Sequence, residues 1–463
     1  MSRMDRLKVL VIGIDGASWD VLDPLISSGE LSTFKYLVRN GVRGILRSTY
    51  PPWTVPAWNS ICSGLSPKGL GYASFMIPTS DYVFIPHLFK CEEPKYIWDY
   101  LSDAGYRVIV ANVPNTYYVK GKVNGIIISG WLCSDIKRFA YPPEILSELN
   151  RLCGGYVIDI YEVDFKRGQI VKAPSYEEMQ SKILEMLDKR ICAYKHLLTK
   201  YEWDLAFLVF TATDRAQHTF YHDKKFIAQV YKRIDNYILK ELMNIAGEDT
   251  IVFVVSDHGF GPASKCFKVN LWLLKEGYLK IRWSYLITLT LLRVCKKLVA
   301  GAVRKFDSTL LSKILSYIDG IREELERDRF AKLIDWSKTK VFAYGVWGDL
   351  YVNIRGRFAK GAIDPSEYKK IVIEVIGKLK QQFPRIQVLS KYEAYGTDSV
   401  HDNLPDNIII PTDNGVHSID PNLSLRDIIK SRVFVECTKG EHRVDGIFIC
   451  YGPKEEYYSQ GCC

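Results

Sequence analysis

The sequence lacks several signals that place a protein in a specialised class. Its eleven cysteines are scattered, with no Cys-x-x-Cys pair and no regular spacing. The first residues, Met1 to Lys8, are polar, and the apolar run behind them is too short for a signal peptide. We therefore expect reduced cysteines and a cytoplasmic protein.

No charge of one sign dominates the sequence. Lys and Arg number 62 and Asp and Glu 53, so the net charge of +9 is mild for 463 residues, and we expect no nucleic acid polymer as a partner. Charged residues make up 25% and hydrophobic ones 47%, which is the composition of a globular protein and not of a disordered one. The length fits one large domain with insertions or a few smaller domains.

Three apolar runs are typical of strands buried on both faces of a parallel sheet. They span residues 8–14, 205–210 and 251–255, and helical stretches alternate with them along the chain. This alternation predicts an α/β fold with a mostly parallel sheet. Ligands of such sheets bind in the crevice beyond the carboxyl ends of the strands.

The first strand is not followed by a dinucleotide-binding loop. The pattern G-x-G-x-x-G is not met, because Asp15 and Gly16 are followed by Ala17 and Ser18. The carboxylate of Asp15 would also repel a pyrophosphate unless a cation lay between them. A cation site therefore fits this strand end better than a dinucleotide.

Acidic residues and histidines follow the other two strands. Asp257 and His258 come shortly after Val255, and glycines at 259 and 261 are expected to let the chain turn away there. Asp214 and His218 are four residues apart, so on a helix they share one face and could hold one cation together. The alternative is that the aspartates only cap the segments that follow.

His442 completes a set of three carboxylates and three imidazoles. The sequence has only eight histidines, so chance does not account well for three of them beside these acidic segments. Such a set suits two divalent transition-metal ions, which can clamp the attacking and leaving oxygens in phosphoryl transfer. Six unrelated cap and core residues are the alternative: Asp15, Asp214, Asp257, His218, His258 and His442.

Thr54 is the candidate nucleophile. Pro51, Pro52 and Pro56 hold it in a non-helical segment, and we expect a helix to begin near Pro56. Thr54 would then lie just before a helix N-terminus, where backbone N–H groups favour an ionised oxygen. A metal ion beside it would make its hydroxyl a nucleophile at neutral pH. The alternative is a simple N-cap.

Residues 280–335 fit no strand pattern. We expect them to form a helical insertion or cap between two parts of one catalytic α/β core, residues 1–279 and 336–463. Within the insertion, residues 285–305 mix leucines and valines with basic residues and are too charged to span a bilayer. A helix packed on the core and a basic helix that lies on a membrane surface are both open.

Five segments together resemble the alkaline phosphatase superfamily. They are IGIDGASWD, PPWTVPAW, FTATDRAQH, VVSDHGFGP and GEHRVDGIF, and they run from residue 9 to about residue 452. The resemblance is to the type I phosphodiesterase/nucleotide pyrophosphatase branch, in its prokaryotic group of predicted phosphohydrolases or phosphomutases. It implies a three-layer sandwich around a mostly parallel central sheet, and a small phosphate ester as substrate.

The resemblance also implies how two divalent ions, zinc or alternatively manganese, share their ligands. One ion would be held by Asp214, His218 and His442. The other would be held by Asp15, Asp257, His258 and the hydroxyl of Thr54. Thr54 would attack phosphorus to give a phospho-threonine intermediate, which water then hydrolyses.

The chain departs from this branch where the phosphate is bound. Nucleotide pyrophosphatases carry an asparagine after the nucleophile helix, whereas residues 71–76 contain none. Asn59, Arg215 and Arg443 are candidates for substrate contact. A phosphomutase with the same metals and a non-catalytic protein of membrane surfaces are the alternatives to a hydrolase.

Overall fold

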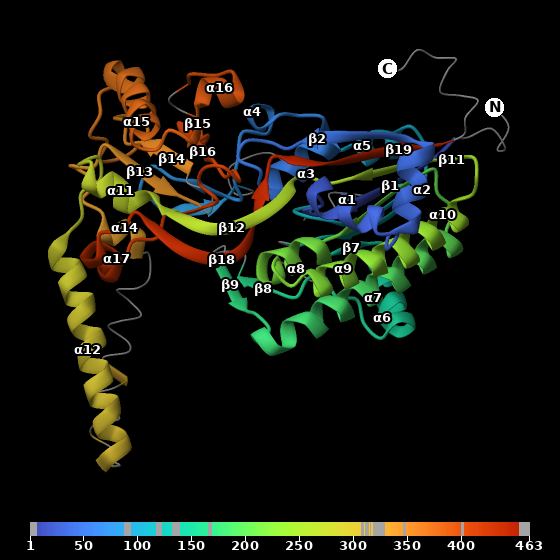
Figure 1. Cartoon of the computed structure of the whole chain (residues 1–463), viewed down its shortest axis with the longest axis horizontal. Coiled ribbons are helices and arrows are strands. Elements are labelled where there is room, and N and C mark those ends of the chain that lie inside the picture. The colour runs from blue at the N-terminus through green and yellow to red at the C-terminus, as the bar shows by residue number, and fades with distance from the viewer. Residues whose placement is uncertain are drawn as a thin grey trace.

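An eight-stranded sheet organises the larger part of the chain (Figure 1). The structure is a computed structural model that describes residues 7–87, 94–116, 123–131, 139–164, 169–306, 310, 314, 316–317, 329–345, 349–399 and 402–452. In spatial order, the sheet consists of β2 (Val42–Arg47), β19 (Asp445–Tyr451), β11 (Thr250–Val255), β1 (Lys8–Ile14), β10 (Leu205–Phe210), β5 (Val108–Val113), β6 (Gly125–Ser129) and β7 (Ala140–Tyr141).

The five strands from β11 to β6 are parallel to one another. β19 pairs antiparallel with both β11 and β2, and β7 pairs antiparallel with β6. The three apolar runs predicted as buried strands are the three central neighbours β11, β1 and β10. The predicted mostly parallel sheet is therefore confirmed.

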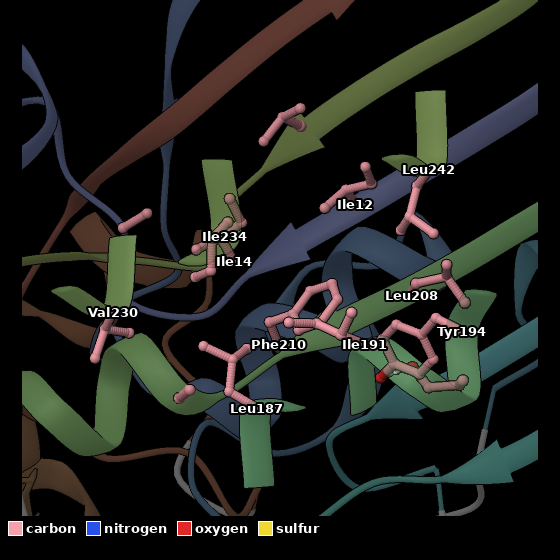
Figure 2. Close-up of a cluster of buried hydrophobic side chains, with 14 of the residues drawn as sticks. Ile12, Ile14, Leu187, Ile191, Tyr194, Leu208, Phe210, Val230, Ile234 and Leu242 are labelled. Atoms are coloured by element: carbon pink, nitrogen blue, oxygen red, sulfur yellow. Dashed lines mark hydrogen bonds between the residues drawn. The ribbon is translucent and has the colours of Figure 1, made fainter. Parts of the chain in front are cut away.

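Alternate side chains of the central strands point to opposite faces of the sheet. Ile12, Ile14, Leu208 and Phe210 belong to the larger core, together with Tyr194 of α7 (Figure 2). The helices that contribute to this core are α1 (Trp19–Ser27), α2 (Ser32–Asn40), α6 (Glu144–Cys153), α7 (Tyr176–Lys200), α8 (Ala212–Phe220), α9 (Lys224–Arg233), η3 (Ile234–Leu239) and α10 (Lys240–Ala246).

The other face of the sheet carries a smaller core. Phe207 and Val209 of β10 pack there with Trp58 and Trp98. These tryptophans belong to α3 (Thr54–Ser63) and α5 (Ile97–Asp103). Helices on both faces of one sheet make the three-layer sandwich that the resemblance implies.

A long antiparallel ribbon extends from the central sheet to the rest of the chain (Figure 1). It consists of β12 (Gly259–Lys268) and β18 (Phe434–Arg443), and the short β17 (Ser418–Asp420) joins β12. The expected turn at Gly259 and Gly261 is therefore wrong, because β12 begins at Gly259 itself. A Cβ at Gly259 would lie 2.0 Å from the carbonyl oxygen of Asp445, so glycine allows a close approach there rather than a turn.

A four-stranded antiparallel sheet lies at the far end of the ribbon (Figure 1). Its strands, in spatial order, are β13 (Val341–Tyr344), β14 (Asp349–Val352), β16 (Asn407–Ile410) and β15 (Gln387–Ser390). This sheet has its own core, around residues such as Phe342, Tyr351 and Val375. The helices around it are α11 (Val269–Lys275), α14 (Arg329–Leu333), η4 (Pro365–Glu367), α15 (Tyr368–Gln382), α16 (Lys391–Tyr395) and α17 (Leu425–Lys430).

The remaining short elements lie in the loops. They are α4 (Pro67–Leu70), the pair β3 (Met76–Pro78) and β4 (Phe84–Pro86), and the pair β8 (Glu162–Asp164) and β9 (Gln169–Lys172).

The expected insertion contains one long helix, α12 (Trp283–Phe306), which extends away from the rest of the chain (Figure 1). Most of residues 307–328 lie outside the described part of the chain. Of the helices that the structure describes, none combines the length and the apolar character needed to cross a membrane.

Two cysteines form a disulfide. Cys153 at the end of α6 and Cys192 of α7 are joined, with Cα atoms 5.8 Å apart. The expectation that the cysteines are reduced is therefore wrong for this pair. Because the two residues are 39 positions apart and meet only when α6 packs on α7, their spacing gives no sequence motif.

Candidate active site and metal centre

Three aspartates meet at the carboxyl edge of the central sheet. Asp15 follows β1, Asp257 follows β11, and Asp214 lies in the first turn of α8, just after β10. Because β11, β1 and β10 are parallel neighbours, their carboxyl ends lie side by side. All three side chains are buried. The topology thus brings together acidic residues that are up to 242 positions apart in the sequence.

The first group of candidate ligands surrounds one ring nitrogen of His258. His258 Nε2 lies 3.5 Å from Asp15 Oδ1 and 3.3 Å from Asp257 Oδ2. The hydroxyl of Thr54 lies 3.3 Å from the same nitrogen. The other ring nitrogen, Nδ1, is 3.0 Å from the carbonyl oxygen of Gly259. A proton on Nδ1 would donate to this carbonyl and leave the lone pair of Nε2 facing the two carboxylates.

The second group consists of Asp214, His218 and His442. Asp214 Oδ1 lies 3.3 Å from His218 Nε2 and 3.1 Å from His442 Nε2, and the two ring nitrogens are 3.0 Å apart. The first two residues share one face of α8, as their spacing predicts. His442 comes from β18, and its Nδ1 faces the carbonyl oxygen of Pro52 at 2.8 Å. Its Nε2 therefore also points into the site.

The two groups are adjacent. His258 Nε2 is 4.0 Å from Asp214 Oδ1. Together with His442, these residues form a cluster whose ligand atoms lie within 4.8 Å of one another, and the same holds for His218, Glu441 and His442. Seven residues predicted from the sequence are thus gathered in one site: Asp15, Thr54, Asp214, His218, Asp257, His258 and His442.

Burial perturbs the ionisation of these groups. Burial, together with the charge of Asp214, raises the pKa of Asp15 well above its ordinary value. Burial and Asp15 do the same to the pKa of Asp257. Burial would also raise the pKa of Asp214, but His218 and Arg215 outweigh it and hold that pKa below its ordinary range. Burial and His442 lower the pKa of His258 well below its ordinary value, which favours the neutral imidazole.

These residues fit divalent cations. Asp15 Oδ1 and Asp257 Oδ2 are buried and have no hydrogen-bond partner among the described residues, although both face His258. Buried polar atoms are normally paired, and a cluster of carboxylates is costly without a positive charge between them. Carboxylates and neutral imidazoles are also the donors that zinc and related ions prefer.

Thr54 begins helix α3. The helix was expected to start near Pro56, but Thr54 is its first residue, and Trp53 has extended backbone angles at the N-cap. Pro56 is the third residue of the helix. The first N–H groups of a helix have no partner within it, so the missing N–H of a proline does not disturb the first turn. The Thr54 hydroxyl is buried at the positive end of the helix dipole.

Trp58 supports the site from α3, and no pattern in the sequence predicts this role. Its indole N–H donates to Asp15 Oδ2 at 3.1 Å, one helical turn after Thr54. A Cβ at Gly13 would lie 2.5 Å from the Trp58 ring, so only glycine lets the indole pack over β1. Gly13 and Asp15 are two residues apart in the sequence, but no local pattern shows that Trp58 of α3 packs against both.

A comparison with protein families assigns the chain. The family described as type I phosphodiesterase/nucleotide pyrophosphatase matches residues 9–420. The chain belongs to this family. The match confirms the resemblance to the type I phosphodiesterase/nucleotide pyrophosphatase branch noted in the sequence. Members of the type I phosphodiesterase family are metal-dependent hydrolases of phosphoric esters, and the expected enzyme class is confirmed.

Two solved structures with TM-scores above 0.5 show the same fold. Phosphonoacetate hydrolase from Sinorhizobium meliloti 1021 in complex with phosphonoformate is 16% identical, with a TM-score of 0.59 over 97% of this chain and 91% of that chain. The same hydrolase with phosphonoacetate is 15% identical, with a TM-score of 0.56 over 97% and 91% of the two chains. Murine ectonucleotide pyrophosphatase/phosphodiesterase 5 is 14% identical, with a TM-score of 0.49 over 96% and 88%. Curated protein sequences give no significant match.

The guanidinium groups of the two arginine candidates, Arg215 and Arg443, already donate to oxygen atoms of the protein. Arg215 donates to both carboxylate oxygens of Asp159 and, at 2.5 Å, to Asp214. Arg443 donates to Asp413 and to main-chain carbonyls that include that of His442. Asp159 was missed from the sequence because it lies in a loop without a recognisable pattern.

Asn59 differs from the arginines. Its side-chain N–H group donates to the Tyr72 hydroxyl at 2.5 Å, and its Oδ1 atom is buried without a hydrogen-bond partner in the described part of the chain. It lies on α3, five residues after Thr54. Of the three candidates for substrate contact, Asn59 thus has a side-chain polar atom that is available for a further hydrogen bond.

Proposed function

We propose that this chain hydrolyses a small phosphoric ester through a phospho-threonine intermediate on Thr54, with two divalent metal ions as cofactors. The observation that carries the proposal is the position of the Thr54 hydroxyl, 3.3 Å from His258 Nε2. Asp15 and Asp257 converge on the same nitrogen. A threonine that served only as an N-cap would not need an imidazole and two carboxyl groups gathered beside it.

The ligand sets follow the two groups of side chains. Asp15, Asp257, His258 and Thr54 would hold one ion, and Asp214, His218 and His442 would hold the other. Zinc is our preferred metal because each set combines imidazole and carboxylate donors, with manganese as the alternative. When bound, the ions would supply positive charge for the phosphoryl and leaving oxygens and lower the pKa of the attacking hydroxyl.

The protein groups arrange two displacements at phosphorus. In the first, the Thr54 oxygen forms a bond to phosphorus while the bond to the leaving alcohol breaks. In the second, water forms a bond to phosphorus and the bond to Thr54 breaks, which restores the hydroxyl. The N-terminus of α3 favours the negative oxygen of Thr54 through its free N–H groups and dipole. The products are an alcohol and either phosphate or a phosphate monoester.

Asn59 is proposed as the substrate contact on α3. If its amide is rotated by half a turn, Oδ1 accepts from the Tyr72 hydroxyl and the NH₂ group becomes free to donate to a phosphoryl oxygen. The oxygen and nitrogen of an amide are assigned from such networks. Arg215 and Arg443 would instead orient the ligands Asp214 and His442, because protein oxygens already take up their donors.

The test compares Thr54→Ala and Thr54→Ser with the unaltered enzyme on p-nitrophenyl mono- and diesters. Thr54→Ala is expected to lose activity by a factor of about a thousand or more, whereas Thr54→Ser keeps a hydroxyl and part of the rate. Acid quenching during turnover and mass spectrometry should find phosphate on the peptide that contains Thr54. Full activity of Thr54→Ala would reject the nucleophile.

Measurement of free phosphate in the same reactions separates hydrolysis from a phosphomutase. The mutase would move the phosphoryl group within its substrate without net release of phosphate.

A further inference from the structure

Helix α12 is buried near its beginning, within the part of the chain that the structure describes. Leu286 and Leu289 are buried, and Leu286 belongs to the core of the four-stranded sheet. Beyond this point the helix extends away from both sheets (Figure 1). A helix of 24 residues is about 36 Å long, so most of its length lies beyond these two buried leucines.

The exposed part of α12 carries a continuous apolar stripe. Successive members of the stripe are three or four residues apart, a spacing that places them on one face of a helix. Their side chains are about half exposed or more: Trp283 52%, Ile287 54%, Leu291 58%, Val294 49% and Leu298 68%. A single exposed leucine needs no explanation, but an aligned set of this kind indicates an interaction surface.

The charge of α12 indicates what this surface fits. The helix sequence contains five basic residues, Arg293, Lys296, Lys297, Arg304 and Lys305, and no aspartate or glutamate. Pairing with α12 of a second copy would bring like charges together. An anionic lipid surface offers the opposite charge for the basic residues and an apolar layer for the stripe. The charges that prevent the helix from spanning a bilayer are compatible with a helix lying in its surface.

We propose that α12 docks this protein on the surface of an anionic membrane, with the stripe from Trp283 to Leu298 entering the boundary between headgroups and acyl chains. The proposal is independent of the ester that the active site hydrolyses. It requires only that the apolar stripe and the basic residues of α12 act together.

Flotation of the full chain with lipid vesicles tests the proposal. The protein should float with vesicles of equal parts phosphatidylcholine and phosphatidylglycerol and not with phosphatidylcholine alone. Binding to the anionic vesicles should fall as salt is raised, because salt screens the attraction between the charges. Absence of flotation with the anionic vesicles would overturn the proposal.

Variants locate the binding surface. The double variant Leu291→Ser/Leu298→Ser should bind at least about tenfold more weakly, and Lys297→Gln should weaken binding less. Ile373→Ser is the matched control, because Ile373 lies on α15 and is also 68% exposed. Thermal unfolding confirms that each variant is folded. Unchanged flotation of the double variant would overturn the proposal, as would sedimentation showing that the stripe instead pairs two copies in the absence of lipid.

Discussion

The imidazole rings of His258 and His442 stack face to face, with centroids 3.5 Å apart and ring planes 18° apart. They come from the two chain segments that meet at one end of the ribbon. Each ring faces a main-chain carbonyl through Nδ1 and the carboxylates through Nε2. The stack is thus the shared wall of the two proposed metal sites.

Replacement of His442 should empty one metal site and leave the other. His442→Ala is expected to retain one ion per chain instead of two and to lose activity by more than about a hundredfold, because Asp214 and His218 alone do not complete the site. Metal analysis of the purified protein measures the ions. His222→Ala is the control, since His222 is exposed and outside the clusters of candidate ligands. Two retained ions in His442→Ala would contradict the assignment.

Trp58 should act on metal affinity rather than on folding. Trp58→Phe keeps an aromatic ring but removes the hydrogen bond to Asp15 Oδ2, which fixes the direction of that carboxylate. We expect metal affinity to fall by about ten- to a hundredfold, as for other partners of metal ligands. Competition with a chelator measures it. Trp98→Phe changes a tryptophan of the same core and should leave metal affinity unchanged.

A side chain at Gly13 should destabilise the protein. In Gly13→Ala the new methyl group would lie 2.5 Å from the Trp58 ring and 2.8 Å from Val209, so β1 or α3 must shift. We expect the free energy of unfolding to fall by about 1–3 kcal/mol and metal binding to weaken with it. Gly377→Ala is the opposite control, because this glycine of α15 has open space around it, and the change should stabilise by up to about 1 kcal/mol.

Asp349 should make stability depend on pH. Burial raises its pKa from 3.8 to about 8, so the folded protein keeps a proton that the unfolded chain releases above about pH 4. The contribution of Asp349 to the free energy of unfolding is therefore fully present below the pKa of this group in the unfolded chain. It falls by up to about 1.4 kcal/mol per pH unit as the pH rises towards 8.

Asp349→Asn cannot release the proton, so the variant should gain stability relative to the unaltered protein as the pH rises. Urea unfolding at several pH values measures this difference. Asp81→Asn, at an exposed position, should show no such trend. An equal pH dependence with and without Asp349 would exclude it as the source.

Much of this site could be predicted because parallel strands fix where their ends lie. An apolar run followed by an aspartate is visible in a single sequence, and the sheet then places Asp15, Asp214 and Asp257 at one edge. The helical spacing of Asp214 and His218 is likewise local information. The start of strand β12 could not be predicted, because Gly259 suits both a turn and the close approach of another backbone.

Other features depend on contacts between distant segments. Trp58 reaches Asp15 across two layers, Asp159 pairs with Arg215 from a loop, and Cys153 meets Cys192 only when two helices pack. The residue types at these positions are ordinary, so no local pattern marks them. Only the tertiary structure gives such residues their roles.

The pairing register of β12 and β18 determines which side chains line the proposed metal centre. Phe260 pairs with His442 and Gly259 with Arg443, so main-chain hydrogen bonds decide which side chain of β18 enters the site. A slip of one residue would turn the imidazole of His442 to the opposite face of β18, away from Asp214 and His218. The irregular pairing between Ala263 and Lys265 lies farther along the ribbon and can absorb a length change there. Insertions beyond this bulge should therefore spare the histidines, whereas one between the bulge and Gly259 would change the chemistry of the site.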